Sequence, residues 1–275
     1  MLILLCGQVA AAPHQNIPRQ NIPRQNIPRH IMSLKVCTDE LLLDLVPPSR
    51  IASISFLSHE AASLQVWPVA ARIAVNHNTA EEILAARPDL ILTDTFIPAA
   101  LKPLLAKTGA KVVMVPPADD FAGIRANVRL VAHAVGAEEK GEALIARMDR
   151  ALADLKARRP RHRPTVAQWG NGGYVAGKAG LFDALLDAAG ARNIETRAFG
   201  YYDVESLLAA RPDFLIYGDT YAGTASLRAD QDLHPALLVR YGNRRIHYRG
   251  LYGCGVPQAV DAARQIQDAL TGRAP

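Results

Sequence analysis

The sequence predicts an α/β protein of two similar lobes, each built on a central parallel sheet, joined by a long α-helix and separated by a ligand cleft. Three observations predict this fold class. A helix-to-strand segment occurs twice, strands alternate with helices at both ends of the chain, and the middle of the chain has only helical periodicity. Clefts between lobes are preferred ligand sites, so the predicted fold includes a place for a ligand.

The duplicated segment carries most of this prediction. Residues 81–92 (EEILAARPDLIL) return as residues 205–216 (ESLLAARPDFLI), so equivalent positions lie 124 residues apart (81 to 205). Each copy predicts a helix, a Pro-Asp turn and a buried strand. Thr79 and Asp203 are the matching N-cap residues, because their side-chain oxygens can accept hydrogen bonds from the first helical turn. The spacing indicates two lobes rather than a solenoid, whose repeats run to about 20–50 residues.

The first lobe is expected at 34–119. Its pattern predicts a short strand at 34–37, a helix at 40–45 capped by Thr38 or Asp39, a strand at 50–55, the first copy of the repeat ending in strand 90–93, a helix at 98–107 and a strand at 111–115. Strands that alternate with helices of this length imply a parallel sheet with helices on both faces.

The connecting segment is expected at 120–160 and contains two predicted helices, 121–135 and 138–158. In the second helix, apolar residues recur at three- and four-residue steps and make a one-sided stripe, which comprises Ala143, Leu144, Met148, Leu152 and Leu155. A helix of about 20 residues is about 30 Å long. We therefore expect a stiff strut between the lobes rather than a flexible linker.

The second lobe is expected at 161–275. The pattern predicts a strand at 165–168, a helix at 181–189 that ends at Gly190, the second copy ending in strand 214–217, a strand at 245–248 and a closing helix at 257–270. The same alternation as in the first lobe predicts a second parallel sheet. Both lobes are therefore expected to be Rossmann-like.

The first 33 residues are expected to be a leader that includes a low-complexity repeat. Residues 1–12 have an apolar run and an Ala-Ala-Ala end suited to signal-peptidase cleavage, although a positively charged n-region is lacking. Residues 15–29 are three copies of QNIPR, whose prolines prevent a regular helix. The leader predicts an exported, periplasmic protein, and Leu5 before Cys6 argues against a lipid anchor.

Two cysteines, Cys37 and Cys254, remain outside the leader. In an exported protein an even pair can form a disulfide, but both can equally be independent small buried residues. The sequence leaves the two interpretations open.

Composition excludes several classes of function. The net charge of +5 is spread along the chain without a basic stripe interleaved with aromatics, which argues against nucleic-acid binding. The histidines are scattered, with no pair at i, i+4 spacing and no Cys-x-x-Cys, so we expect no directly bound metal and no cofactor. Outside the leader no apolar stretch of about 18 residues occurs.

An enzyme is the alternative interpretation. Gly170, Gly172 and Gly173 follow a strand, but the next helix begins only near Leu181, whereas a dinucleotide-binding fingerprint needs its glycines to open the helix. A two-lobed oxidoreductase or a glycosyltransferase-like enzyme would use the same cleft, and fold class alone does not exclude it. No nucleophile or phosphate-loop motif supports it. We therefore expect no enzymatic activity.

The order of lobe, long helix and lobe, with Glu-x-x-x-x-x-x-Pro-Asp before a strand in both lobes, resembles the substrate-binding proteins of ABC importers for cobalamin and iron complexes. Residues 168–178 (QWGNGGYVAGK) and the following helix also look like the second lobe of that family, and the resemblance covers about residues 34–270. Within that family, the sequence resembles the periplasmic cobalamin-binding proteins most. The resemblance implies a membrane permease as partner, and we expect a monomer.

The resemblance also implies that Glu81 and Glu205, each seven residues before the proline of the repeat, dock on arginines of the permease. A carboxylate in the first turn of a helix is favoured by the helix dipole, and an exposed one can pair with Arg through both oxygens. The alternative is that both glutamates only stabilise their helices.

The ligand is expected on loops that follow the carboxyl ends of the strands, as in open α/β sheets generally. The residues selected in this way are Cys37, Thr38, His77, Asp94, Trp169, Tyr174, Tyr202 and Tyr252. Aromatic rings with polar tips give large, rigid contact areas, which suit a corrinoid, a heme or a ferric siderophore. The sequence does not choose among these ligands, and His77 is the residue best placed to contact an iron complex.

Overall fold

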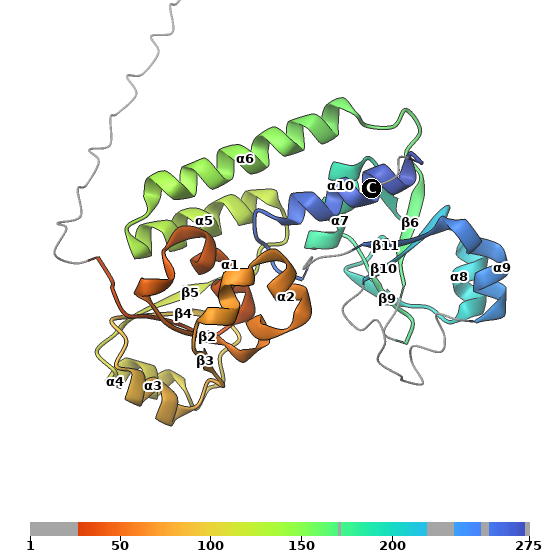
Figure 1. The fold of residues 1–275 in the computed structure, drawn as a ribbon. Helices are drawn as coiled ribbons and strands as arrows, with labels where there is room; N and C mark the ends of the chain where they lie inside the picture. The colour runs from red at the N-terminus through yellow and green to blue at the C-terminus, as the bar shows by residue number, and fades with distance from the viewer. Residues whose placement is uncertain (1–26, 170–171, 219–233, 249–252, 273–275) are drawn as a thin grey trace, which may run out of the picture.

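The computed structural model describes residues 27–169, 172–218, 234–248 and 253–272. The chain forms two α/β lobes beneath a shared layer of helices (Figure 1). Each lobe has its own parallel sheet, one of five strands and one of four, so the predicted fold class is confirmed.

The first lobe contains the five-stranded sheet, whose strand order is β3-β2-β1-β4-β5. Its elements are β1 (Ile31–Ser33), α1 (Val36–Leu45), β2 (Ile51–Ser55), α2 (Ala61–Val66), β3 (Val75–Asn76), α3 (Ala80–Ala86), β4 (Leu90–Asp94), α4 (Lys102–Lys107) and β5 (Lys111–Val115). Ile31 and Met32 are both fully buried but belong to different apolar clusters. Because successive side chains of a strand point to opposite faces, the sheet is buried on both sides, as parallel sheets are.

The expected strand at 34–37 is wrong. The strand is β1, three residues earlier, and the helix α1 begins at Val36. Residues 31–33 pair with both β2 and β4, and Leu34 then leaves the sheet while remaining buried. The short apolar stretch around Leu34 and Val36 has no periodicity that separates a strand end from a helix start. Strand β1 therefore lies inside the segment that we expected to be leader.

The second lobe contains the four-stranded sheet, whose order is β11-β10-β6-β8. Its elements are β6 (Thr165–Gln168), β7 (Tyr174–Ala176), α7 (Leu181–Ala189), β8 (Arg192–Asn193), β9 (Phe199–Tyr201), α8 (Val204–Ala210), β10 (Phe214–Gly218), α9 (Pro235–Tyr241), β11 (Arg245–Tyr248) and α10 (Ala259–Leu270). This order matches β5-β4-β1-β2 of the first lobe, so the duplication read from the sequence extends to the topology. The strands β7 and β9 form a separate antiparallel ribbon.

The connection between the lobes consists of α5 (Phe121–Val135) and α6 (Glu138–Ala157), which confirms the two helices predicted there. The long helix α6 packs on α5 at the first lobe and on α7 and α10 at the second (Figure 1). Ile31, Leu155 and Ile266, from the first lobe, the strut and the second lobe, belong to one continuous buried cluster. The strut is therefore part of a core that both lobes share.

The two repeat copies fold alike, beginning with their caps. The Thr79 side chain accepts a hydrogen bond from the Glu82 amide, and the Glu82 carboxylate accepts one from the Thr79 amide, which makes a capping box. In the second copy Asp203 accepts from the amide of Ser206 at 2.7 Å. Both predicted N-caps are confirmed.

The aspartate of each Pro-Asp turn fastens the central strand of its lobe. The Asp89 carboxylate accepts a hydrogen bond from the amide of His30, one residue before β1, at 3.1 Å. The Asp213 carboxylate accepts from the amide of Thr165, the first residue of β6, at 2.7 Å. This contact lowers the pKa of Asp213 below its ordinary value. The repeat therefore joins each helix-to-strand unit to the middle of its sheet.

Candidate ligand cleft

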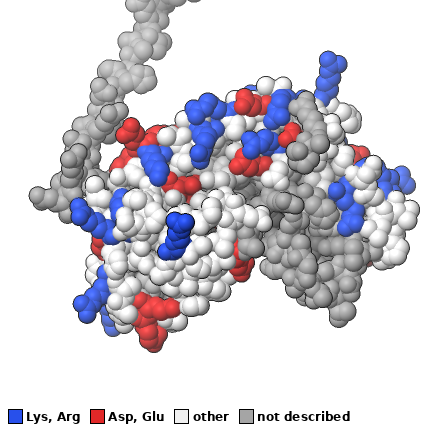
Figure 2. Space-filling model, viewed as in Figure 1, with Lys and Arg blue, Asp and Glu red and all other residues white. Residues whose placement is uncertain are grey.

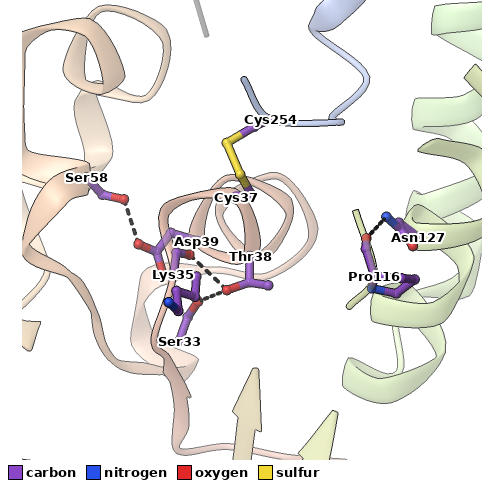
Figure 3. Close-up of a disulfide and its surroundings, with 9 residues drawn as sticks. All are labelled: Ser33, Lys35, Cys37, Thr38, Asp39, Ser58, Pro116, Asn127 and Cys254. Carbon is purple, nitrogen blue, oxygen red and sulfur yellow. Dashed lines mark hydrogen bonds between the residues drawn. A yellow bond between two sulfur atoms is a disulfide. The ribbon is translucent and has the colours of Figure 1, made fainter. Parts of the chain in front are cut away.

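A segment that follows a strand of the first lobe is joined to a segment that follows a strand of the second lobe. Cys37 lies in the first turn of α1, directly after β1, and forms a disulfide with Cys254, which follows β11 (Figure 3). The Cα atoms of the two cysteines are 5.1 Å apart, although 217 residues separate them in sequence. The bond decides the question that the sequence left open. Open α/β sheets place their ligands at the carboxyl ends of their strands, so we take the region beside this disulfide as the candidate cleft.

A seam of further contacts lies beside the disulfide. The Asp44 carboxylate, two turns along α1 from Cys37, accepts hydrogen bonds from Trp67 Nε1 at 3.0 Å and from Gln258 Nε2 at 2.5 Å. Gly255 packs so closely on the first lobe that an added Cβ would lie 2.5 Å from the Cβ of Ala118. Residues 253–258 of the second lobe are therefore fixed to the first lobe along α1.

The first-lobe wall of the candidate cleft carries exposed aromatic side chains just after strands β2 and β4, which lie on either side of β1. Phe56 directly follows β2 and is 43% exposed, and Phe96 follows β4 and is 72% exposed. His77 directly follows β3, and its ring stacks on that of Phe56 with 5.1 Å between centroids. Large apolar side chains left in water next to a cleft are typical of ligand contacts.

His77 is held by a carboxylate. Its ring Nδ1 lies 3.0 Å from Glu82 Oε1, and its backbone amide donates to Glu82 Oε2 at 2.8 Å. The hydrogen bonds from His77 lower the pKa of Glu82 to about 2. The same carboxylate completes the capping box with Thr79, so one side chain fixes both the start of α3 and the imidazole.

The second-lobe wall is the aromatic face of the β7–β9 ribbon. Tyr174 pairs directly with Tyr201, and Phe199 lies one pair further along the same face. The ring of Tyr174 is 6.2 Å from that of Phe199 and 5.9 Å from that of Tyr201, in stacked and edge-on arrangements respectively. Phe199 is 54% exposed and Tyr201 is 71% exposed. The three rings form one platform, which we call the aromatic platform.

A buried carboxylate, Glu195, paired with the exposed Arg197 side chain supports the other face of this ribbon. The Glu195 carboxylate accepts hydrogen bonds from the side chain of Arg197 at 2.7 and 3.0 Å, which lower the pKa of Glu195 to about 2. Burial and this carboxylate raise the pKa of Tyr202. Gly200 has no room for a side chain, because a Cβ there would overlap the Glu195 carboxylate and lie 2.8 Å from the Tyr202 ring. The platform therefore rests on a closely packed polar support.

Four of the residues expected to contact a ligand belong to the two aromatic surfaces or to the segments that support them. His77 and Tyr174 belong to the two aromatic walls, and Tyr202 belongs to the support of the platform. The Asp94 carboxylate, at the end of β4, is 3.8 Å from the Lys35 ammonium and accepts a hydrogen bond from the amide of Phe96 at 2.9 Å. Asp94 thereby shapes the loop that presents Phe96.

The other expected residues have different surroundings. Cys37 has its sulfur in the disulfide, and Thr38 is buried with its hydroxyl bonded to Ser33 Oγ and the Lys35 carbonyl, each at 2.8 Å (Figure 3). Trp169 is only 2% exposed and packs in the core of the second lobe. Tyr252 lies outside the described residues.

The residues selected from the sequence do not include the four most exposed aromatic residues of the two walls, although Phe199 and Tyr201 lie on the same predicted loop as the selected Tyr202. Phe56 and Phe96 each come just after a predicted strand, so their loop position was a usable indication. Phe199 and Tyr201 alternate with Gly200, a pattern that predicts a strand with one aromatic face. Their short strand lies between two predicted helices and was not expected.

Glu81 and Glu205 lie in the first turns of α3 and α8, and both are exposed. Figure 2 shows acidic side chains gathered over α3, where Glu82 is the second carboxylate. Elsewhere on this view, lysines and arginines alternate with acidic residues over α5 and α6 rather than forming a stripe of one sign.

A groove of about 480 Å³ lies apart from the cleft, where the start of α5, the second half of α6 and α7 meet. Three of its charged residues are already engaged, since Asp120 caps α5 and Arg159 pairs with Asp187 at 3.2 Å. Within the described ranges, no group of three or more His, Cys, Asp or Glu side chains is arranged to hold a metal ion. None of the described helices is long and apolar enough to cross a membrane.

Comparison with known proteins identifies the class. The profile of the family described as "Periplasmic binding protein" matches residues 31–231, and the chain belongs to this family. Its members are the substrate-binding components of ABC importers, which act outside the cytoplasm. Among curated protein sequences none matches this chain.

Solved structures share the whole fold. A periplasmic heme-binding protein of Vibrio cholerae is 20% identical, with a TM-score of 0.72 over 88% of this chain and 98% of that one. A periplasmic vitamin B12-binding protein of the same organism is 16% identical, with a TM-score of 0.65 over 90% and 98%. A possible iron-binding protein of Staphylococcus epidermidis is 18% identical, with a TM-score of 0.70 over 89% and 99%.

Proposed function

We propose that this substrate-binding protein captures a metal complex with a flat, partly apolar face, such as a heme, a corrinoid or a ferric siderophore, and delivers it to an inner-membrane permease. The observation that carries the proposal is that each lobe has an exposed aromatic surface: the aromatic platform on the β7–β9 ribbon and the Phe56–His77 stack after strands β2 and β3. The similar structures bind heme, vitamin B12 or iron, which supports this ligand class and gives the enzyme alternative no support.

The walls suit such a ligand for physical reasons. Aromatic side chains offer rigid area at low entropic cost, and burial of apolar surface contributes roughly 25 cal/mol per Å² before the costs of association. Both walls are fixed from behind, by Glu82 in the first lobe and by the Glu195–Arg197 pair in the second. A preorganised site loses little side-chain entropy when the ligand binds.

The connection between the lobes suggests how much the cleft can open. The strut α6 shares a core with both lobes, and the disulfide adds a second covalent link beside it. A hinge that lets two lobes open widely needs residues whose φ and ψ angles can change by large amounts. We therefore propose a small opening, with release driven by the permease, which contacts Glu81 and Glu205.

The proposal is tested by titrating the purified protein with hemin, aquocobalamin and a ferric siderophore, followed by absorbance and by fluorescence of the two tryptophans. We expect saturable, reversible binding of at least one complex at a ratio of one to one. Phe199→Ala with Tyr201→Ala should weaken that binding at least tenfold, because it removes two rings of the platform. Val239→Ala, at a position 88% exposed on α9, is the matched control. Absence of saturable binding, or chemical turnover of the ligand, would contradict the proposal.

A further inference from the structure

The seam between α1 and residues 253–258 contains a buried carboxyl group that ligand capture does not use. Cys37 and Asp44 both contact the second lobe, through the disulfide (Figure 3) and through the hydrogen bond from Gln258 at 2.5 Å. Glu40 comes three residues after Cys37 and four before Asp44, so the three side chains lie along one face of α1. Glu40 therefore lies between the two points at which the second lobe is fastened to this helix.

The surroundings of Glu40 do not compensate a charge. Its side chain is fully buried, and neither carboxyl oxygen has a hydrogen-bond partner in the described part of the chain. Between its two fastened ends the facing segment has the apolar residues Val256 and Pro257, both buried. The amide nitrogen of Gln258 is already bonded to Asp44. An ionised carboxylate without partners is costly in such a place, so the closed seam holds Glu40 as the neutral acid.

The elements packed against α1 bring no compensating cation to Glu40 within the described ranges. Strands β1 and β2 and residues 253–258 contain no Asp, Glu, His, Lys or Arg. The charged or titratable groups on the other elements have partners of their own: Asp94 faces Lys35, His59 faces the Ala70 carbonyl, and Arg125, Arg129 and His133 of α5 face Asp149, Glu142 and Glu138. The groups that act on Glu40 are acidic. Burial first, then Asp39 and Asp44, raise its pKa to about 9.

We propose that Glu40 is a proton-dependent switch of the interlobe seam, which is closed while Glu40 is protonated and opens with release of that proton to water. Because the disulfide holds Cys254, the segment separates from α1 at its Gln258 end. Opening admits water to the carboxyl group, whose pKa then returns toward its ordinary value of 4.5. The closed seam binds the proton more tightly than the open seam, so opening becomes more favourable as the pH rises from about 4.5 toward about 9. This switch governs how the lobes separate and does not depend on which ligand is bound.

The test is hydrogen exchange, followed by mass spectrometry, of the ligand-free protein with its disulfide intact at pH 6, 7 and 8. Wild-type protein is compared with Glu40→Gln, which cannot ionise. At each pH the chemical exchange rate of a given amide is the same in both proteins, so the ratio of their rates in residues 253–261 reports the opening of the seam. We expect this ratio, wild type over variant, to rise at least tenfold between pH 6 and pH 8, and about a hundredfold if one full proton is released. These residues should also exchange faster than the buried strand β10.

Two further variants complete the experiment. Glu40→Met is neutral and of similar size, and it leaves no hydrogen-bond partner unsatisfied, so it should behave as Glu40→Gln does. Glu139→Gln, at an exposed position of α6, is the matched control and should keep the pH dependence of the wild-type protein. A ratio that stays within twofold from pH 6 to pH 8 would refute the switch, and so would exchange of residues 253–261 only together with β10. Either result would leave the proposed function untouched, because no ligand takes part.

Discussion

The disulfide between Cys37 and Cys254 gives the prediction with the largest expected effect on stability. It closes a loop of 217 residues, and the chain-entropy relation converts that length into an upper value of about 5 kcal/mol at 25 °C. Removal of native disulfides costs about 2–5 kcal/mol, and a loop of this length belongs in the upper part of that range. For a chain of this size each 1 kcal/mol lowers Tm by about 2–4 °C.

We therefore expect the double variant Cys37→Ala with Cys254→Ala to melt about 10 °C or more below the wild-type protein in calorimetry under oxidising conditions. A reductant should lower the Tm of the wild-type protein by a similar amount and leave that of the variant unchanged. Hydrogen exchange should accelerate in α1 and in residues 253–258, which lose their covalent link. A Tm within about 2 °C of the wild-type value would refute the reasoning, because the lobes would then be fixed by the strut alone.

Three further predictions concern the docking on the permease, the buried carboxyl group of Glu40 and the support of the aromatic platform. Reversing the charges of Glu81 and Glu205 to lysine should abolish uptake in cells while leaving ligand affinity within twofold. Burial, and secondly the nearby Asp39, raise the pKa of the buried Glu40 carboxyl group to about 9. The folded state therefore keeps a proton on Glu40 that the unfolded state releases above a pH of about 4.5. Its contribution to stability is complete below pH about 4.5 and falls as the pH rises toward about 9, so Glu40→Gln should stabilise the protein against guanidinium more at pH 8 than at pH 5. Gly200→Ala should weaken ligand binding at least tenfold, because the added Cβ overlaps the Glu195 carboxylate.

Each of these predictions has a control or an opposite outcome. Charge reversal at Glu139 and Asp154, exposed acidic residues of α6, should not affect uptake, and a loss of affinity in the docking variant would assign its glutamates to the cleft or to the fold. An equal effect of Glu40→Gln at the two pH values would show that Glu40 is ionised in the folded protein. Gly180→Ala is the control for Gly200→Ala, because a Cβ at Gly180 meets nothing within 4 Å.

Much of the fold could be predicted because its signals are local or repeated. The caps Thr79 and Asp203 are defined within four residues, and the periodic stripe of α6 extends over about three turns, so neither depended on distant contacts. The segment that recurs 124 residues later in the chain predicts that the two lobes are built alike. The start of the first strand was misplaced, because residues 31–36 carry no alternation and only the pairing of β1 with β2 and β4 defines it.

The residues of the site were harder to predict from the sequence, because the site depends on which loop residues remain exposed in the fold. Trp169 follows a strand as a ligand residue would, yet it fills the core of the second lobe. Phe199 and Tyr201 lie beside Tyr174 only because β9 pairs with β7, and no local sequence pattern predicts that pairing. The disulfide likewise required the two sheet edges to meet, which spacing alone could not establish.

The most direct test of the account is a crystal structure of the protein with its bound metal complex. The account predicts ligand density between the aromatic platform and the Phe56–His77 stack. Density in the groove between α5, α6 and α7 instead, or on an outer face of either lobe, would contradict it.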